Sequence, residues 1–150
     1  FFDNLRRKGI PILTHNIELL KTFALQFPLV RHVAVSSATR KDIEENLHTA
    51  HITDIIKEGI SYEDHLGIKR KPAPDMYLYA LKKLDIRANE CIAFEDSMSG
   101  VISATSAGIR CIALPNALTA RQDFSSATFV IPSGTNRDPQ TILKKLGFLL

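Results

Sequence analysis

A chain of 150 residues with 45% hydrophobic and 23% charged side chains has the composition of an ordinary globular protein and is long enough for one buried core. Its formal net charge of +3 is too small, and its basic residues are too scattered, to indicate a nucleic-acid partner. No apolar stretch reaches the length of a membrane span. From the charge and from the apolar pattern, respectively, we expect neither a nucleic acid nor a membrane as partner.

The N-terminal residues predict the end of one helix and the whole of a second. Residues 1–8 have the apolar spacing of a helix that Gly9 ends, and residues 10–14 form a linker. Asn16 is a candidate N-cap for the next helix, which Pro28 stops. Because the sequence starts within a helix and without a methionine, we expect it to be part of a longer natural chain.

Residues 33–47 predict a strand, a turn rich in hydroxyl groups and a helix. The strand is the apolar run Val33–Val35, and the helix begins near Arg40, after the turn SSAT. Backbone N–H groups and the helix dipole point at such a turn, which suits it to bind an anion. The alternative is a serine that caps the helix and binds no ligand.

The next segment places a lysine between a strand and a helix. Residues 55–60 predict a second strand, and the polar loop of residues 61–70 leads to the sequence KPAPD. The two prolines restrict the backbone around Lys71, and Pro74 and Asp75 are typical of a first helical turn. The apolar stripe of the helix consists of Met76, Ala80, Leu81 and Leu84.

A pair of carboxylates follows the next apolar run. Residues 91–94 have the length and composition of a buried strand, and Glu95 and Asp96 come directly after them. Ser97 is a candidate N-cap for a helix of small residues that ends at Gly108. Ligands of open α/β sheets bind beyond the carboxyl ends of the strands. Two carboxylates there are either ligands of a hard cation or part of a solvated turn.

Strands and helices continue to alternate to the C-terminus. Residues 111–114 and 129–131 predict two more strands, the second at a sheet edge, and residues 141–146 predict the last helix. This alternation predicts a doubly wound parallel sheet of the α/β class. Cys91 and Cys111 open two strands that we expect to be neighbours. Because the two cysteines have no metal-ligand spacing, we expect free thiols, a reducing compartment and a cytoplasmic protein.

Three sets of polar residues share the end of a strand or the start of a helix. They are Ser37, Lys71, and the pair Glu95 and Asp96. In phosphoryl transfer a hydroxyl and backbone amides hold phosphate oxygens, a lysine neutralises charge and carboxylates hold Mg²⁺. The three sets together therefore favour phosphate chemistry, and we expect their side chains to converge at one edge of the sheet.

Three strings of the sequence resemble motifs of a known superfamily. VAVSSATR, KRKPAPDMY and FEDSMSGVISATSAG are similar, in this order, to the second, third and fourth motifs of the haloacid dehalogenase superfamily. The similarity is greatest to its beta-phosphoglucomutase-like phosphatase branch and extends over residues 16–131. The resemblance implies a Rossmann-like α/β core that carries out phosphoryl transfer.

The resemblance also implies which residues bind the phosphate. Ser37 matches the hydroxyl residue of the second motif, with Ala38 supplying a backbone amide and Thr39 adjoining them. Lys71 matches the lysine that stabilises both the phosphate and the nucleophile, and it is the expected catalytic residue of this chain. Thr39 and Arg40 occupy positions that can face the substrate.

For the metal, the resemblance implies Mg²⁺ at the acidic pair of the fourth motif. Asp96 is the expected direct ligand, and Glu95 is expected to act through a water molecule. The implied reaction is the Mg²⁺-dependent hydrolysis of a small phosphate ester, such as a sugar phosphate, through an aspartyl-phosphate in the intact protein. The expected partner is therefore a small phosphorylated metabolite.

The first motif of the superfamily, an Asp-x-Asp on the central strand, has no match. Asp3 is the only early aspartate, and no second aspartate follows two positions later. We expect residues 1–14 to be the remnant of a helical cap and linker, residues 15–150 to be the core domain, and the first core strand to be missing. Because that strand lies between them in the family, the strands ending at Ser37 and Glu95 should not be hydrogen-bonded neighbours.

Several other functions share parts of this pattern. A phosphosugar mutase and a non-catalytic protein that only holds phosphate or Mg²⁺ both remain alternatives. A response-regulator receiver domain also combines acid, hydroxyl and lysine, but its acidic pair comes early in the chain, whereas here it comes last. A haloalkanoic-acid dehalogenase needs no Mg²⁺, so Glu95 and Asp96 favour phosphate chemistry.

Overall fold

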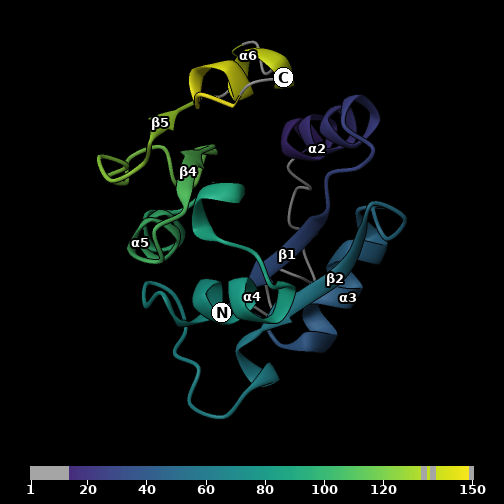
Figure 1. The fold of residues 1–150 in the computed structure, drawn as a ribbon, viewed down its shortest axis with the longest axis vertical. Coiled ribbons are helices and arrows are strands. Elements are labelled where there is room, and N and C mark those ends of the chain that lie inside the picture. The colour runs from purple at the N-terminus through teal and green to yellow at the C-terminus, as the bar shows by residue number, and fades with distance from the viewer. Residues whose placement is uncertain (1–13, 133–134, 136–137, 149–150) are drawn as a thin grey trace.

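The computed structural model describes residues 14–132, 135 and 138–148, in which parallel strands alternate with helices (Figure 1). The elements are α2 (Thr14–Gln26), β1 (His32–Ser36), α3 (Arg40–Thr49), β2 (Ile56–Ser61), α4 (Asp75–Leu84), β3 (Ile92–Glu95), α5 (Met98–Ser106), β4 (Arg110–Ala113), β5 (Phe129–Val130) and α6 (Pro139–Lys145). Two short 3-10 helices, Tyr62–Asp64 and Ala88–Glu90, lie in the connections. The order confirms the predicted α/β class.

The strands form two separate parallel sheets in the described part of the chain. β1 pairs with β2, and β3 pairs with β4 so that Ala93 lies opposite Cys111. β5 pairs with β4 alone, as predicted for an edge strand. The predicted pairing of the strands after Cys91 and at Cys111 is confirmed, although β3 itself begins at Ile92. Both cysteines are free, Cys111 buried and Cys91 half-buried. β1 and β3 are not paired with each other, as we expected.

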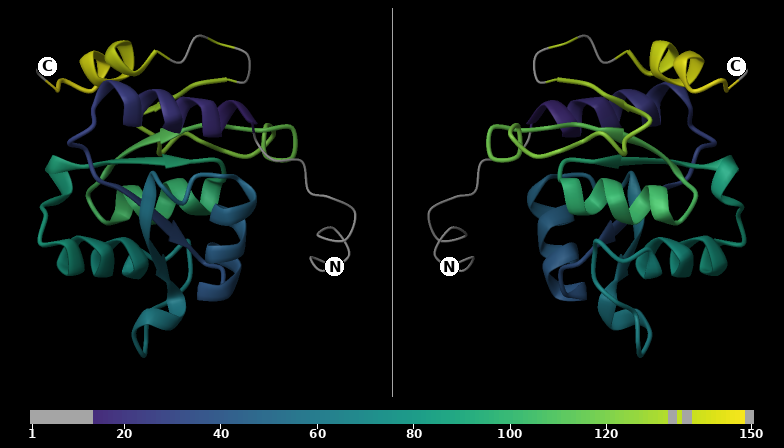
Figure 2. Two further views of the ribbon diagram at one scale, coloured as in Figure 1. Left: turned by 90° about the vertical axis from the view of Figure 1, so that its right-hand side faces the viewer. Right: turned by 90° about the vertical axis from the view of Figure 1, so that its left-hand side faces the viewer.

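Helices cover both faces of the three-stranded sheet. On one face, α5 and α4 bury Val101, Ala104 and Tyr77 against Ala93 and Cys111. On the other face, α2 and α6 enclose a second cluster, and Figure 2 shows them on the opposite side of the strands from α5. The buried members of this cluster are Leu19, Phe23, Ile112, Leu114, Ile131, Ile142 and Leu146. Successive residues of β4 thus serve different cores, which is the doubly wound arrangement.

The two-stranded sheet is covered less completely. α3 packs on β2 at Gly59, where a Cβ atom would lie only 2.8 Å from Cγ2 of Ile43, so a glycine allows this close contact. α4 contacts both β1 and β2. The apolar run Val33–Val35 predicts a buried strand, but all five residues of β1 are only half-buried, so this expectation is wrong. The reason is that, within the described residues, β1 has a paired strand on one side only.

Two differences from the predicted boundaries have consequences. α2 begins at Thr14, so Asn16 lies inside the helix and the prediction that it caps the helix is wrong. Glu95 is the last residue of β3, paired with Ala113, whereas we expected it to follow the strand. The predicted helix end and Asp3 lie in residues 1–13, outside the described residues. No helix within the described ranges is both long and apolar enough to cross a membrane.

Candidate functional site

The carboxyl ends of β1 and β3 adjoin one cavity of about 380 Å³. All three sets of polar residues that the sequence singled out meet in it, because β1, β3 and the turn before α4 all end at this edge. Its lining residues are Val35, Ser36, Ser37, Lys71, Glu95, Asp96, Ser97 and Ser99. Serine hydroxyls, one lysine and two carboxylates in one space match the donors and acceptors of a phosphate and its counter-ion.

Ser37 is held in place by the residues around Lys71. Its hydroxyl oxygen accepts a hydrogen bond from the backbone N–H of Lys71 at 3.2 Å, and it contacts the sulfur of Met76 at 3.6 Å. The neighbouring Ser36 hydroxyl accepts from the backbone N–H of Ala38 at 3.2 Å. The turn after β1 is therefore connected to the turn before α4, which fixes Ser37 at the cavity.

Ala38 and Thr39 do not line the cavity. The hydroxyl of Thr39 accepts from the backbone N–H of Asp42 at 3.1 Å and thereby caps α3. The carbonyl oxygen of Ala38 accepts from the Ser61 hydroxyl at 2.9 Å. In this arrangement both residues shape the turn, and their phosphate-binding roles stay predictions.

Lys71 lies between the two sheets. Its ammonium donates to the carbonyl oxygen of Val35 on β1 at 2.7 Å and to Oε1 of Glu95 on β3. Only 11% of the Lys71 side chain and 8% of the Glu95 side chain are exposed, so this ion pair is largely withdrawn from water. An ammonium has three N–H donors, and two of them are used in these bonds. The third remains for a ligand in the cavity.

Glu95 is buried below the cavity by three neighbours. The hydroxyl of Tyr77 donates to Oε1 at 2.5 Å, beside Lys71. Gly100 of α5 lies against Oε2, where a Cβ atom would come within 1.9 Å of that oxygen. Burial, and then the negative charge and hydrogen bond of Glu95, raise the pKa of Tyr77 well above its ordinary value. Tyr77 therefore stays neutral and keeps donating its proton to the carboxylate.

Asp96 differs from Glu95 because it lies beyond the strand, in the turn before α5. Its Oδ2 accepts a hydrogen bond from Nδ2 of Asn116 at 3.0 Å. The other end of the Asn116 amide, Oδ1, accepts from the backbone N–H of Leu118 at 2.8 Å. That second bond determines which end of the amide faces Asp96. Asp96 is thus oriented at the cavity, and no cationic side chain among the described residues forms an ion pair with it.

The N-terminus of α5 opens onto the same cavity. Ser97 caps the helix, and its hydroxyl accepts from the backbone N–H of Gly100 at 3.2 Å. Ser97 and Ser99 both line the cavity, with their hydroxyl oxygens 3.4 Å apart. The positive end of the helix dipole and these hydroxyls favour an anion at this position.

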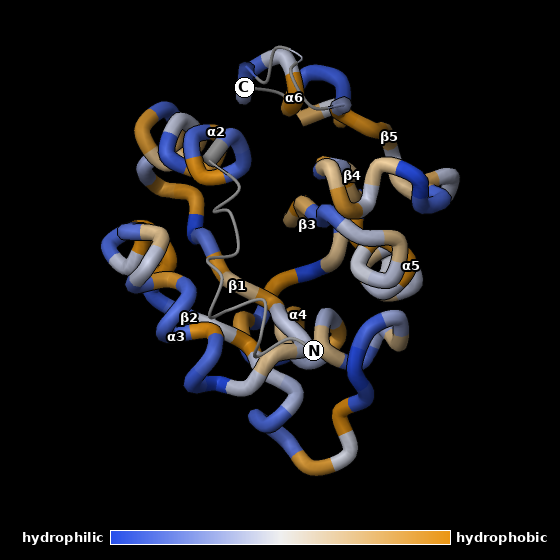
Figure 3. The backbone as a smooth tube through the Cα atoms, turned by 180° about the vertical axis from the view of Figure 1, so that it is seen from behind, coloured by the Kyte–Doolittle hydropathy of each residue, from blue (hydrophilic) through white to orange (hydrophobic). Residues whose placement is uncertain are grey.

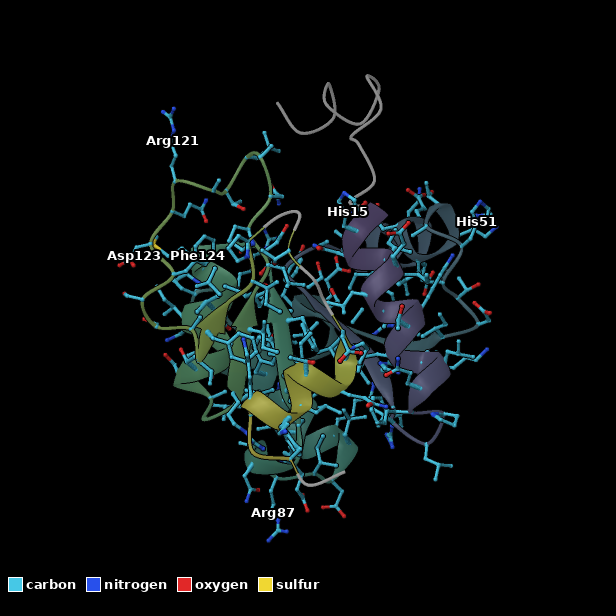
Figure 4. The ribbon with its side chains drawn as sticks, turned by 90° about the horizontal axis from the view of Figure 1, so that it is seen from above. His15, His51, Arg87, Arg121, Asp123 and Phe124 are labelled. Atoms are coloured by element: carbon cyan, nitrogen blue, oxygen red, sulfur yellow. The ribbon has the colours of Figure 1, made fainter. Side chains whose placement is uncertain are left out.

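The side chains of this cavity could coordinate Mg²⁺ only through one or two carboxylates, with the other ligands supplied by phosphate and water. No group of three or more His, Cys, Asp or Glu side chains within the described ranges is arranged to hold a metal ion. His15 on α2 and His51 after α3 lie at the periphery of the molecule (Figure 4). Mg²⁺ is commonly held by one or two carboxylates, with phosphate oxygens and waters as its other ligands. Asp96, bordered by Ser97 and Ser99, fits this mode.

Arg40 turns away from this cavity. Its guanidinium donates to the carbonyl oxygen of Gly59 at 3.4 Å and forms an ion pair with Asp64. It lines a second hollow of about 420 Å³. The other residues of that hollow are Glu63, Asp64, Tyr79 and Lys83. The structure therefore does not bring Arg40 together with Ser37 and Lys71.

Sequence reasoning missed three residues of the site, namely Tyr77, Gly100 and Asn116. From the sequence, Tyr77 is more readily interpreted as a packing residue than as a catalytic one, and in the structure its hydroxyl contacts Glu95. Tyr77 is the third residue of α4, six positions after Lys71, and this spacing carries no chemical signal in one sequence. Asn116 does have a signal, because it is a polar residue shortly after β4, at the same sheet edge as Asp96.

Known proteins resemble this chain in both sequence and structure. The chain is 47% identical over 77 residues to "Protein CbbY" of Rhodobacter capsulatus, a match that covers 51% of this chain and 34% of that protein. This chain also aligns with the crystal structure of CbbY from Rhodobacter sphaeroides in complex with phosphate, with 23% sequence identity and a TM-score of 0.70. That match covers 87% of this chain and 56% of the CbbY chain and shows a shared fold.

A second structure, of a CbbY mutant from Rhodobacter sphaeroides in complex with xylulose-(1,5)bisphosphate, is 25% identical with a TM-score of 0.65. The alignment covers 76% of this chain and 50% of the mutant CbbY chain. This chain thus spans about a third of the curated relative and about half of the solved proteins. The sequence pattern of the family described as "Haloacid dehalogenase-like hydrolase" matches residues 12–114, more than half of the chain. The chain therefore belongs to the haloacid dehalogenase-like hydrolases.

Proposed function

We propose that the protein carrying this chain transfers the phosphoryl group of a small phosphate ester to water, with sugar phosphates as the substrate class. The observation that carries the proposal is the cavity shared by Ser37, Lys71 and Asp96. A hydroxyl, an ammonium with one N–H to spare and an oriented carboxylate are the groups that phosphoryl transfer requires around a phosphate. The complex of a relative with xylulose-(1,5)bisphosphate supports the choice of sugar phosphates.

The roles follow from the contacts of each side chain. Ser37 and the N-terminus of α5 would bind non-bridging oxygens of the phosphate. Lys71 would neutralise the charge that develops on them, from a position fixed by Val35 and Glu95. Asp96 would hold Mg²⁺, which, when bound, stabilises negative charge on the phosphate. The aspartyl-phosphate expected from the family would form on a residue outside those described, because Asp96 is the one aspartate in the described cavity.

The organisation and compartment of the protein are part of the proposal. We infer that residues 15–150 form the core domain and that residues 1–14 belong to a cap and its linker. Both thiols are free, and burial raises the pKa of Cys91 and that of Cys111, which keeps them protonated. Free cysteines support a reducing compartment, consistent with the cytoplasm.

The test is phosphate release by the natural protein that carries this sequence, from a panel of sugar phosphates, nucleotides and other phosphate esters. We expect release from sugar phosphates that stops in excess chelator, and a loss of about 10²–10³-fold in Lys71→Met, as for other removed transition-state donors. Asp96→Asn should lose Mg²⁺-dependent release, while Asp123→Asn, in an exposed loop, is the matched control. Full activity of Asp96→Asn in chelator would contradict the proposal.

A further inference from the structure

The hydroxyl of Tyr77 and the ammonium of Lys71 meet on one carboxylate oxygen. Tyr77 lies on α4, is 7% exposed and does not line the cavity. Its hydroxyl donates to the same Oε1 of Glu95 that accepts from Lys71. A residue with no access to a ligand therefore contacts the group that holds the lysine of the site.

The second oxygen of Glu95 has little freedom. A Cβ atom at Gly100 would lie 1.9 Å from Oε2, so the carboxylate fills the space against α5. Its orientation is then set on the other side, by the two donors on Oε1. Removing either donor from a buried carboxylate leaves acceptor capacity unsatisfied, and the group reorients to recover it.

The direction of the Lys71 ammonium depends on this orientation. One N–H is directed at the Val35 carbonyl oxygen and another at Glu95 Oε1, which together determine where the third points. A carboxylate that rotates takes its N–H partner with it. Hydrogen bonds thus connect Tyr77 through Glu95 to Lys71, whose ammonium lies at the cavity.

We propose that Tyr77 is a positioning residue: its hydroxyl fixes Glu95, and Glu95 directs Lys71 at the bound phosphate. In this arrangement Glu95 orients the Lys71 ammonium, and Asp96 is the carboxylate available to bind a cation. The identity of the ligand rests on the proposed function, whereas the line of hydrogen bonds does not. Two readouts therefore separate failure of one from failure of the other.

The first readout is the side-chain ammonium signal of Lys71 in ¹H–¹⁵N NMR spectra of the natural protein that carries this sequence, assigned with Lys71→Met. An ammonium held by two buried acceptors exchanges slowly with water. Tyr77→Phe should speed this exchange about tenfold, the factor that corresponds to one hydrogen bond to a charged group. Tyr79→Phe, on the same helix but in the second hollow, is the matched control and should not change it.

A purely structural role for Tyr77 would give a different result, because the backbone amides of β3 and β4 would then exchange faster together with the ammonium. An unprotected Lys71 ammonium in the unmodified chain, or an unchanged one in Tyr77→Phe, would overturn the proposal. Faster exchange of the neighbouring amides to the same degree would overturn it as well.

The second readout is the affinity for inorganic phosphate, measured by calorimetry. Tyr77→Phe should bind phosphate about tenfold more weakly than Tyr79→Phe, by the same reasoning. Equal affinities would overturn the positioning role. If the unmodified chain binds no phosphate, the proposed function fails, and the ammonium signal still decides on Tyr77.

Discussion

The two sheets of this molecule are buried to very different degrees. In β4, Cys111, Ile112 and Ala113 are fully buried, because β4 has a strand on each side and helices on both faces. In β1 every residue is half-buried. The two sheets also differ in composition: in Figure 3, β5 is hydrophobic, whereas hydrophilic residues interrupt the hydrophobic ones along β2.

This difference shows how the site is built. The three-stranded sheet has its own apolar cores, to one of which β1 adds the half-buried Val35. Polar groups at the carboxyl ends of the strands also connect β1 to β3. Lys71 is the centre of that connection, because it bonds to Val35 of β1 and to Glu95 of β3. The same lysine therefore contributes both to joining the two sheets and to the proposed chemistry.

The largest effect on stability should come from Lys71→Met. It leaves the Glu95 carboxylate buried without its cation, and breaking a buried ion pair in this way costs about 3–5 kcal/mol of the free energy of unfolding. Denaturation with urea measures the loss. The double variant Lys71→Met/Glu95→Gln should recover much of it, because no uncompensated charge remains. If the double variant is as unstable as the single one, the ion pair does not connect the sheets in this way.

A smaller loss is expected from Gly100→Ala. The added methyl group would overlap Oε2 of Glu95, so that the carboxylate or α5 must move. Overpacking of this kind costs about 1–3 kcal/mol. Ser106→Ala, at an exposed position of the same helix, is the control and should leave stability nearly unchanged. A Gly100→Ala variant with normal stability would show that Glu95 has room that the structure does not give it.

High pH should destabilise the three-stranded sheet, because the thiol of Cys111 on β4 is buried. Burial raises the pKa of this thiol to about 12. In the unfolded chain the thiol loses its proton at about pH 8.5, so the unfolded state is favoured as the pH rises from there towards 12. Cys111→Ala should flatten this decline in stability, and Cys91→Ala, with its half-buried thiol, should flatten it less. Equal slopes in both variants would contradict the contrast in burial.

Low pH should destabilise the two-stranded sheet, and by less than high pH destabilises the three-stranded sheet. Burial lowers the pKa of His32 at the start of β1, and its Nε2 has no hydrogen-bond partner among the described residues. The unfolded chain takes up this proton near pH 6.5, so His32 contributes stability above that pH and loses it as the pH falls. His32→Gln should remove part of this dependence, while His15→Gln on the exposed start of α2 serves as control. Amide exchange that accelerates first in β3 would contradict the assignment.

The sequence was sufficient for the order of the elements and for the polar residues near the strand ends, although β3 extends to Glu95, one residue beyond its expected end. Alternating apolar runs and turn residues predict the α/β order, and Ser37, Lys71 and Asp96 each follow from position at a strand end or helix start. Tyr77 and Gly100 could not be predicted, because their role depends on the buried direction of the Glu95 side chain. The half-burial of β1 was missed for a similar reason, since an apolar run says nothing of which strands lie beside it.

The central claim, that Ser37, Lys71 and Asp96 form one phosphate site, is tested most directly by calorimetric titration of the natural protein that carries this sequence with inorganic phosphate, with and without Mg²⁺. We predict that Mg²⁺ strengthens phosphate binding, that Ser37→Ala and Lys71→Met weaken it under both conditions, and that Asp96→Asn removes only the part that depends on Mg²⁺. Phosphate binding that is identical in the unmodified chain, Lys71→Met and Asp96→Asn would contradict the claim.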